Sequence, residues 1–172
     1  MILKNKKVIA LICCRGGSKG IPNKNIKSFN NKPLLEWTLE NALKSKVFDE
    51  IILSTDSTEI AEVGNKYNIN IPGLRPAYLS TDNSDVFDAH SYIFKKLNIN
   101  DKNSVVCILT NNPFIDYNLI EKGYKISLKT LLLVNNQVHF GKFKLKQNPT
   151  YYQILKSIVL PSNFYNKITI VE

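Results

Sequence analysis

An apolar run and a glycine-rich turn meet in the segment Val8-Ile9-Ala10-Leu11-Ile12-Cys13-Cys14-Arg15-Gly16-Gly17-Ser18-Lys19-Gly20. The apolar part, residues 8–14, predicts a buried strand of a parallel sheet. Ligands of open α/β sheets bind beyond the carboxyl ends of such strands, which is where this turn lies. Its glycines allow backbone N–H groups to approach an anion closely. The segment therefore predicts an anion site at the end of the first strand.

Charged and polar side chains surround these glycines. Those that a polyphosphate could contact are Arg15, Ser18, Lys19 and Lys24. Arginine is scarce, since only Arg15 and Arg75 are arginines among the 23 lysines and arginines of the chain. In such a chain an arginine favours a position that needs bidentate hydrogen bonding. The alternative is a solvated glycine turn with incidental lysines.

The loop matches neither of two common phosphate motifs. A P-loop requires Gly-Lys-Ser/Thr at a fixed distance from its first glycine, and Gly16-Gly17 is followed instead by Ile21-Pro22. The dinucleotide fingerprint Gly-x-Gly-x-x-Gly also fails, because Ser18 stands at its second glycine. A different kind of phosphate loop is therefore expected.

The segment Arg15–Asn25 resembles the signature of the acylneuraminate cytidylyltransferases, which make CMP-activated sialic acids and their relatives. Three further segments resemble the same family in the same order: Asn31–Leu39, Ala42–Ser57 and Leu74–Asp82. The resemblance implies a Rossmann-like, three-layer α/β/α nucleotide-diphospho-sugar transferase fold with a mostly parallel sheet. A single domain over residues 1–172 is expected.

The resemblance also implies a reaction, in which CMP passes from CTP to an acidic nine-carbon sugar of the N-acylneuraminate type and pyrophosphate leaves. Arg15 and Lys24 are the implied catalytic residues, which contact the triphosphate. The implied nucleotide-binding residues are Arg15, Gly16, Gly17, Ser18, Lys24, Asn25 and Arg75. The implied sugar contacts are Asn111, Asn112 and Lys129.

Local alternatives stay open at several positions. Arg75 could tie its loop to the sheet, and Asn111-Asn112 could form a plain turn. Asp56 could hold a metal ion, but Asp56 followed three residues later by Glu59 favours a helix cap. His90 is expected to be structural.

The sequence departs from the family pattern toward its C-terminus. Mg²⁺ is implied by the resemblance, but its ligands are not found in this chain, because the family's late aspartate pair would follow Glu172. A core strand is expected to be missing before Lys129, and Leu160 stands in place of an arginine that would pair with the sugar. Residues 126–172 are therefore expected to be an incomplete substrate and dimerisation part, which leaves a homodimer open. The alternatives are a truncated relative that binds nucleotide without turnover and a non-enzymatic interaction module.

Composition limits the size, the location and the partners that we expect of the protein. With 172 residues, 44% of them hydrophobic, the chain can bury one core. No apolar run approaches the about 20 residues of a membrane span, and Met1-Ile2-Leu3-Lys4 lacks the pattern of a signal peptide. A cytoplasmic protein with three reduced cysteines is expected. The net charge of +9 fits an anionic partner, but without a basic stripe interleaved with aromatics nucleic acid is not expected.

Strand and helix patterns alternate along the chain, as a parallel α/β sheet requires. The expected strands are residues 7–13, 50–54, 68–71 and 104–109. The expected helices are residues 33–46, 56–67, 86–97 and 115–124. The first helix is expected to face the sheet with Leu34, Leu35, Trp37, Leu39, Ala42 and Leu43. Beyond Leu128 the pattern degrades, with further strands considered at 131–134 and 168–171.

Overall fold

The computed structural model describes residues 6–18, 20–100 and 103–133, with residues 127–133 described by their backbone. Lys19, the strand considered at 168–171 and most of the expected substrate and dimerisation part lie outside the described residues.

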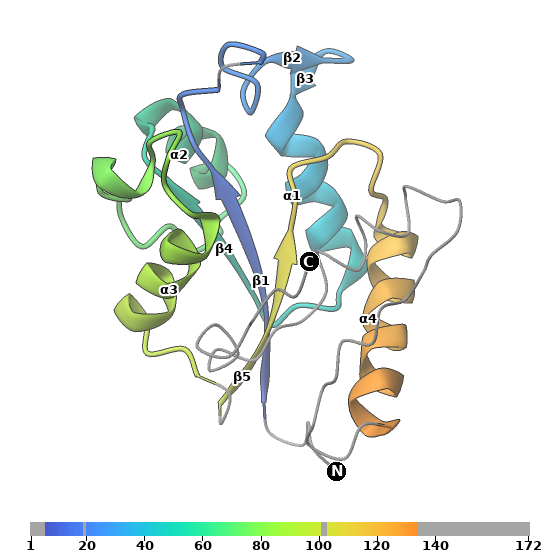
Figure 1. Ribbon diagram of the computed structural model, residues 1–172. Helices are drawn as coiled ribbons and strands as arrows, with labels where there is room; N and C mark the ends of the chain where they lie inside the picture. The colour runs from blue at the N-terminus through green and yellow to red at the C-terminus, as the bar shows by residue number, and fades with distance from the viewer. Residues whose placement is uncertain (1–5, 19, 101–102, 134–172) are drawn as a thin grey trace, which may run out of the picture.

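A parallel sheet of three strands forms the centre of the molecule (Figure 1). The strands are β1 (Lys7–Cys14), β4 (Glu50–Thr55) and β5 (Ser104–Leu109), in the order β4-β1-β5. Ile12 of the middle strand is aligned with Leu53 on one side and with Leu109 on the other. The carboxyl ends of all three strands therefore meet at one edge of the sheet, and the α/β fold expected from the sequence is confirmed.

Helices cover both faces of the sheet. Successive side chains of β1 point to opposite faces, so both sets are buried. On one face, Ala10, Ile12 and Cys14 pack with apolar residues of α1 (Leu34–Ser45), α2 (Thr58–Asn65) and α4 (Tyr117–Leu133). On the other face, Ile9 and Leu11 pack with Ile93 and Phe94 of α3 (Val86–Lys96). The two neighbouring cysteines are thus separated, with Cys13 on the α3 side.

Local sequence explains where the helices begin and end. The Ser57 side chain accepts a hydrogen bond from the Ile60 N–H at 3.3 Å, and the Asp85 side chain accepts one from the Phe87 N–H at 2.9 Å. Both are N-caps, which satisfy donors that the first helical turn leaves free. At the end of α1, Lys46 takes the left-handed conformation with φ 52°.

A short hairpin and a single turn of 3₁₀ helix lie outside the central sheet. Strands β2 (Ser28–Phe29) and β3 (Lys32–Pro33) form an antiparallel hairpin before α1. Asn30 and Asn31 connect them with positive φ angles, as a tight two-residue hairpin turn requires. The 3₁₀ helix η1 (Ala77–Leu79) follows the segment that contains Arg75.

Three expectations about the elements are wrong. Residues 68–71 form only a single bridge, Asn70 to Ile52, because Asn68 turns the chain at φ 51° and Pro72 follows. Leu131 lies in α4 rather than in a strand, since a short apolar run alone does not distinguish the two. Leu43 is 45% exposed, and the polar residue Thr38 takes a place on the buried face of α1.

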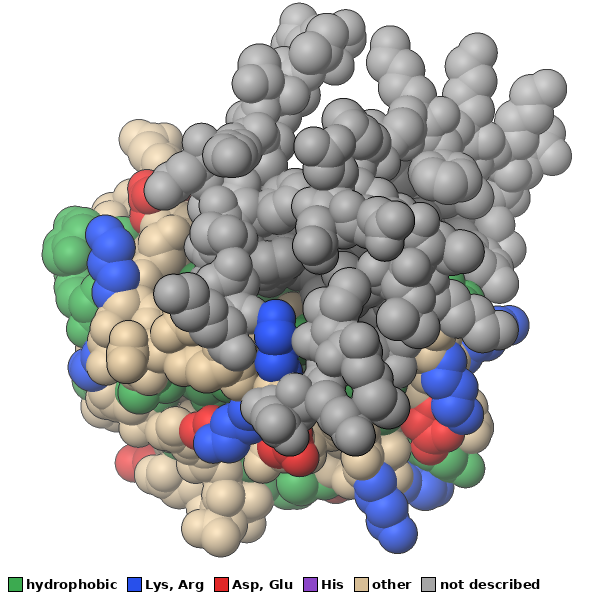
Figure 2. All heavy atoms as spheres, turned by 90° about the horizontal axis from the view of Figure 1, so that it is seen from below, with side chains coloured by type: hydrophobic (Ala, Val, Ile, Leu, Met, Phe, Trp, Pro, Cys, Tyr) green, Lys and Arg blue, Asp and Glu red, His purple; other side chains and the backbone are tan. Residues whose placement is uncertain are grey.

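The described surface is rich in lysine but mixed in sign. Lys7 pairs with Glu50 at 2.9 Å, Lys66 with Glu36 at 3.5 Å, and Lys125 with Glu121 at 3.7 Å. On the face seen in Figure 2, basic side chains outside the grey region lie apart, several beside acidic ones. No helix in the described part of the chain combines the length and hydropathy that crossing a membrane demands.

Candidate functional site

A cavity of about 410 Å³ opens at the carboxyl edge of the sheet. Loops that follow β1, β4 and β5 converge on it, together with the first turn of α3. Its polar lining consists of Arg15, Ser18, Lys24, Asn25, Arg75, Ser80, Thr81, Ser84, Asp85, Thr110 and Asn111. Six residues predicted to bind nucleotide or sugar are therefore brought together, although their segments lie far apart in the chain.

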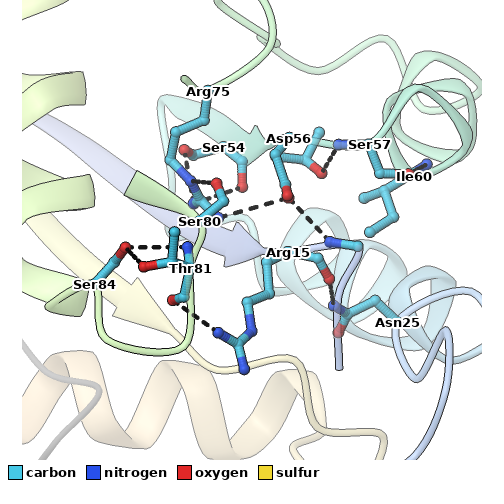
Figure 3. A network of polar contacts seen from close by, with 12 residues as sticks. Arg15, Asn25, Ser54, Asp56, Ser57, Ile60, Arg75, Ser80, Thr81 and Ser84 are labelled. Carbon is cyan, nitrogen blue, oxygen red and sulfur yellow. Dashed lines mark hydrogen bonds and ion pairs between the residues drawn. The ribbon is translucent and has the colours of Figure 1, made fainter. Parts of the chain in front are cut away.

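Arg15 extends from the end of β1 to the segment before α3 (Figure 3). Its Nη1 donates to the carbonyl of Thr81 at 3.0 Å, and its Nη2 pairs with the Asp82 carboxylate at 2.8 Å. Both side chains of the ion pair are more than a third exposed, so solvent screens their attraction. The guanidinium thus stands at the rim of the cavity and is held by a pair that an anion could replace.

Arg75 is held more deeply. Its side chain is 4% exposed, its Nε donates to Ser80 Oγ at 2.9 Å, and its Nη1 donates to Ser54 Oγ at 3.3 Å. Its backbone N–H donates to the Thr55 carbonyl at 2.7 Å. These contacts tie its loop to β4, one of the two roles left open by the sequence, while the residue also lines the cavity.

Asp56 joins Arg75 to the glycine-rich loop. Its Oδ1 accepts a hydrogen bond from the Gly16 N–H at 2.9 Å and lies 3.8 Å from Arg75 Nη2 (Figure 3). The expectation that Asp56 caps a helix is wrong, because the next residue, Ser57, is the cap of α2. The carboxylate instead fixes the start of the loop after β1.

At its first glycine the glycine-rich loop differs from the predicted anion site. The Gly16 N–H is directed to Asp56, and the Gly16 carbonyl accepts a hydrogen bond from the Ser18 N–H at 3.1 Å. A Cβ at Gly16 would lie 3.1 Å from Ser57 Cβ, so this glycine allows close approach to α2. Neither Gly16 nor Gly17 is among the described residues that line the cavity, whereas Ser18 and Lys24 line it.

Three amide and hydroxyl side chains connect the loop after β1 with α1 and the loop after β5. Asn25 Nδ2 donates to the Arg15 carbonyl, and Asn111 Nδ2 donates to Asn25 Oδ1, each at 2.8 Å. Thr38 Oγ1 donates to Asn111 Oδ1, also at 2.8 Å. Sequence reasoning missed Thr38, although a hydroxyl on an otherwise apolar helix face was a signal for it.

Of the two remaining predicted sugar contacts, Asn112 meets this cluster through its backbone N–H, which donates to Thr38 Oγ1 at 3.2 Å. Asn112 Oδ1 accepts a hydrogen bond from the Phe114 N–H at 3.0 Å, which is the plain turn that the sequence left open. Lys129 lies in the last part of α4, and its side chain is outside the described residues.

Burial keeps two titratable groups beside the cavity neutral. The pKa of the Cys13 thiol is raised to about 11, because burial outweighs the opposing effect of nearby Arg75. The pKa of His90 is lowered to about 4, mainly by burial and also by Arg75. At neutral pH neither a Cys13 thiolate nor a His90 imidazolium adds charge here, and the positive charge of the cavity lining comes from arginine and lysine.

The acidic residues near the cavity do not form a metal site. Among the described residues, no group of three His, Cys, Asp or Glu side chains could hold a metal ion. Asp56 is engaged by Gly16 and Arg75, Asp82 by Arg15, and Asp85 by the start of α3. The described acidic residues therefore do not fit Mg²⁺.

Known proteins resemble this chain in both sequence and fold. Residues 9–131 match the pattern of a family described as "Cytidylyltransferase". Pseudaminic acid cytidylyltransferase of Campylobacter jejuni is 34% identical over 159 residues, covering 91% of this chain and 65% of that protein. N-acylneuraminate cytidylyltransferase of Escherichia coli is 36% identical over 170 residues, covering 96% of this chain and 40% of that protein.

A solved structure extends the likeness to the fold. The structure of CMP:2-keto-3-deoxy-manno-octonic acid synthetase complexed with CTP superposes with a TM-score of 0.57 at 19% identity. The match covers 68% of this chain and 45% of that one. The chain thus spans less than two thirds of the length of these relatives.

Proposed function

Because the chain belongs to the cytidylyltransferase family, we propose that it transfers CMP from CTP to a nonulosonic acid and releases pyrophosphate. The acceptor class is suggested by the names of the two relatives, which act on pseudaminic acid and on N-acylneuraminate. Within this class we propose an acceptor of the N-acylneuraminate type.

The observation that carries the proposal is the convergence of cationic side chains on one cavity. Arg15, Lys24 and Arg75 line it together with the Ser18 hydroxyl. Guanidinium and ammonium groups suit phosphate oxygens. These three cations outnumber the one carboxylate of the described lining, that of Asp85, so the cavity should attract an anion. The side-chain amides of Asn25 and Asn111 line the same cavity. An amide both donates and accepts hydrogen bonds, so it suits the hydroxyl groups of a sugar and the polar groups of the cytosine base.

In the proposed reaction a bond forms between the anomeric oxygen of the sugar and the α-phosphorus of CTP. The bond from that phosphorus to the oxygen that bridges the α- and β-phosphates breaks, pyrophosphate leaves with the bonding electrons, and the proton of the anomeric hydroxyl passes to solvent. Such a site must align the two oxygens and stabilise the charge that spreads over the phosphates. Arg15 can do so by exchanging the Asp82 carboxylate for phosphate oxygens, and Lys24 is exposed beside it.

A CTP titration of an arginine variant tests this assignment. We expect Arg15→Ala to weaken CTP binding by about 100-fold in calorimetry, because charge-assisted hydrogen bonds to phosphate are lost. Its circular dichroism spectrum should stay that of the native protein, since the Arg15 side chain lies at the rim. Lys95→Ala removes one exposed positive charge from α3 and should bind CTP normally. Equal CTP affinity in native protein and Arg15→Ala would refute the assignment.

A pyrophosphate-release assay separates turnover from binding. The assay contains CTP, Mg²⁺ and either N-acetylneuraminate or pseudaminic acid, and pyrophosphate formation supports the proposal. CTP binding without pyrophosphate supports the second candidate, a relative that binds nucleotide without turnover. That candidate is favoured by the engagement of Asp56, Asp82 and Asp85 with donors of the chain itself.

A further inference from the structure

Thr38, Asn111 and Asn25 form a hydrogen-bonded chain, here called the amide relay, which ends on the Arg15 carbonyl. Thr38 and Asn25 are only 4% and 6% exposed. Asn25 and Asn111 line the cavity, but Thr38 is not among the described residues that do so. The relay thus leads from the buried face of α1 to the backbone of the residue predicted to meet the triphosphate.

The direction of every hydrogen bond in the relay is fixed from one end. A backbone carbonyl only accepts, so Asn25 must turn Nδ2 toward Arg15 and Oδ1 toward Asn111. Asn111 must then present Nδ2 to Asn25, which leaves its Oδ1 facing Thr38. Only a donor can satisfy that oxygen, and the donor is the Thr38 hydroxyl at 2.8 Å.

The same hydroxyl holds the loop after β5. Thr38 Oγ1 accepts a hydrogen bond from the Asn112 N–H at 3.2 Å while it donates to Asn111. Valine has the shape of threonine without the hydroxyl, so it would deprive both groups of this partner. Loss of one partner in a buried network costs more than the hydrogen bond itself contributes, because the group left behind is desolvated.

We propose that Thr38 is a positioning residue for nucleotide binding, whose hydroxyl acts through Asn111 and Asn25 to hold the Arg15 backbone at the cavity. The inference rests on the proposed function, since it takes CTP as the ligand. Thr38 itself is not expected to touch a substrate, since it is not among the described residues that line the cavity. Through the relay it fixes the position of the Arg15 backbone, from which the side chain extends. That position determines how far into the cavity the guanidinium can reach.

The chain offers a matched control on the same helix. Ser45 lies about two turns beyond Thr38 in α1, is also 4% exposed, and also donates and accepts. Its Oγ donates to the Ala42 carbonyl at 2.7 Å and accepts from the Val47 N–H at 3.4 Å. Loss of this hydroxyl should reduce stability as loss of the Thr38 hydroxyl does, but it has no connection to the cavity.

The test compares Thr38→Val, Thr38→Ser and Ser45→Ala in the full chain. Calorimetry with CTP should show about tenfold weaker binding for Thr38→Val and native affinity for Thr38→Ser and Ser45→Ala. Side-chain amide signals of Asn25 and Asn111 in ¹⁵N NMR spectra without nucleotide should move in Thr38→Val and return in Thr38→Ser. These NMR signals report on the relay whether or not CTP binds.

A second pair of variants keeps the proposal testable if Thr38→Val fails to fold. Asn111→Ala interrupts the relay at its middle and should shift the Asn25 amide signal and weaken CTP binding. In folded proteins, Thr38→Val should cost less CTP affinity in the Asn111→Ala background than in the native one, because only the hydrogen bond from the Asn112 N–H is then left to lose.

Each contrary result has its own meaning. Unmoved amide signals in Thr38→Val, or in Asn111→Ala where Thr38→Val does not fold, would overturn the relay itself. Moved signals with native CTP affinity, equal weakening by Ser45→Ala, or additive losses in the double variant would overturn the positioning role. A native protein that does not bind CTP at all would overturn the proposed function, and the positioning role with it, even if the NMR signals move.

Discussion

His90 shows how burial decides the charge of a single residue beside the cavity. It lies on the inner face of α3, 4% exposed, with its ring edge-to-face against Phe87 at 6.1 Å between centroids. Its pKa is lowered from 6.5 to about 4, mainly by burial and also by Arg75, against the opposing effect of Asp85. The structural role expected from the sequence agrees with this position in the packing of α3.

The depressed pKa of His90 predicts an acid-dependent loss of stability. Above pH 6.5 the imidazole is neutral in both the folded and the unfolded chain, so it contributes no pH dependence. Between pH 6.5 and about 4 the unfolded chain binds the proton and the folded one does not, so the free energy of unfolding falls as pH falls. The contribution reaches about 3 kcal/mol at the lower limit.

Urea unfolding at intervals from pH 7 to pH 4 measures this contribution. His90→Gln, which cannot titrate, should flatten the dependence relative to the native protein, whereas carboxylate titration remains common to both. His139→Gln replaces the other histidine of the chain and serves as the control. A steep dependence that survives in His90→Gln and disappears in His139→Gln would contradict the assignment.

At the scale of elements, the approach of α2 to β4 depends on one glycine. A Cβ at Gly64 would lie 2.6 Å from Leu53 Cδ2 and 2.9 Å from Ile71 Cδ1, both closer than a methyl group tolerates. The sequence predicted the strand and the helix from their apolar patterns, but a pattern does not report how closely two elements pack. For the same reason, the apolar pattern predicted that Leu43 would face the sheet, whereas Thr38 lies on the buried face of α1.

Gly64→Ala should therefore destabilise the fold although alanine favours helices. The gain in helix propensity is about 1 kcal/mol, and overpacking in a closed core costs about 1–3 kcal/mol. We expect a net loss of about 1 kcal/mol in the free energy of unfolding, measured by urea denaturation. Gly20→Ala is the control, because a Cβ at Gly20 meets nothing within 4 Å. A stability gain in Gly64→Ala would show that α2 has room to shift.

At the scale of the whole molecule, sequence reasoning located the cavity but not its internal connections. The rule that parallel strands end at one edge brought Arg15, Arg75 and Asn111 together correctly. The partners that hold them were not predictable in this way, since Asp56 lies 40 residues from Gly16, and Thr38 lies 73 residues from Asn111. Such pairs depend on loop geometry, which periodicity does not encode. A cytoplasmic location, a homodimer and the role of Lys129 stay predictions.

The convergence of distant loops predicts how a bound nucleotide should affect the molecule as a whole. CTP at a hundredfold excess over its dissociation constant should stabilise the fold by about 2.7 kcal/mol. Amide hydrogen exchange should slow together in residues 16–26, 79–85 and 110–112, because all three segments contribute to the lining of one cavity.

A smaller cavity of about 270 Å³, lined by residues such as Glu50, Asn98 and Asn103, provides the control region within the same protein. Its lining lies largely at the amino edge of the sheet, away from the proposed CTP site. Direct contacts with CTP should therefore leave hydrogen exchange in residues 98–100 unchanged. Protection confined to residues 16–26 would mean that the nucleotide touches the glycine-rich loop alone, and equal slowing in both cavities would mean general stabilisation without a defined site.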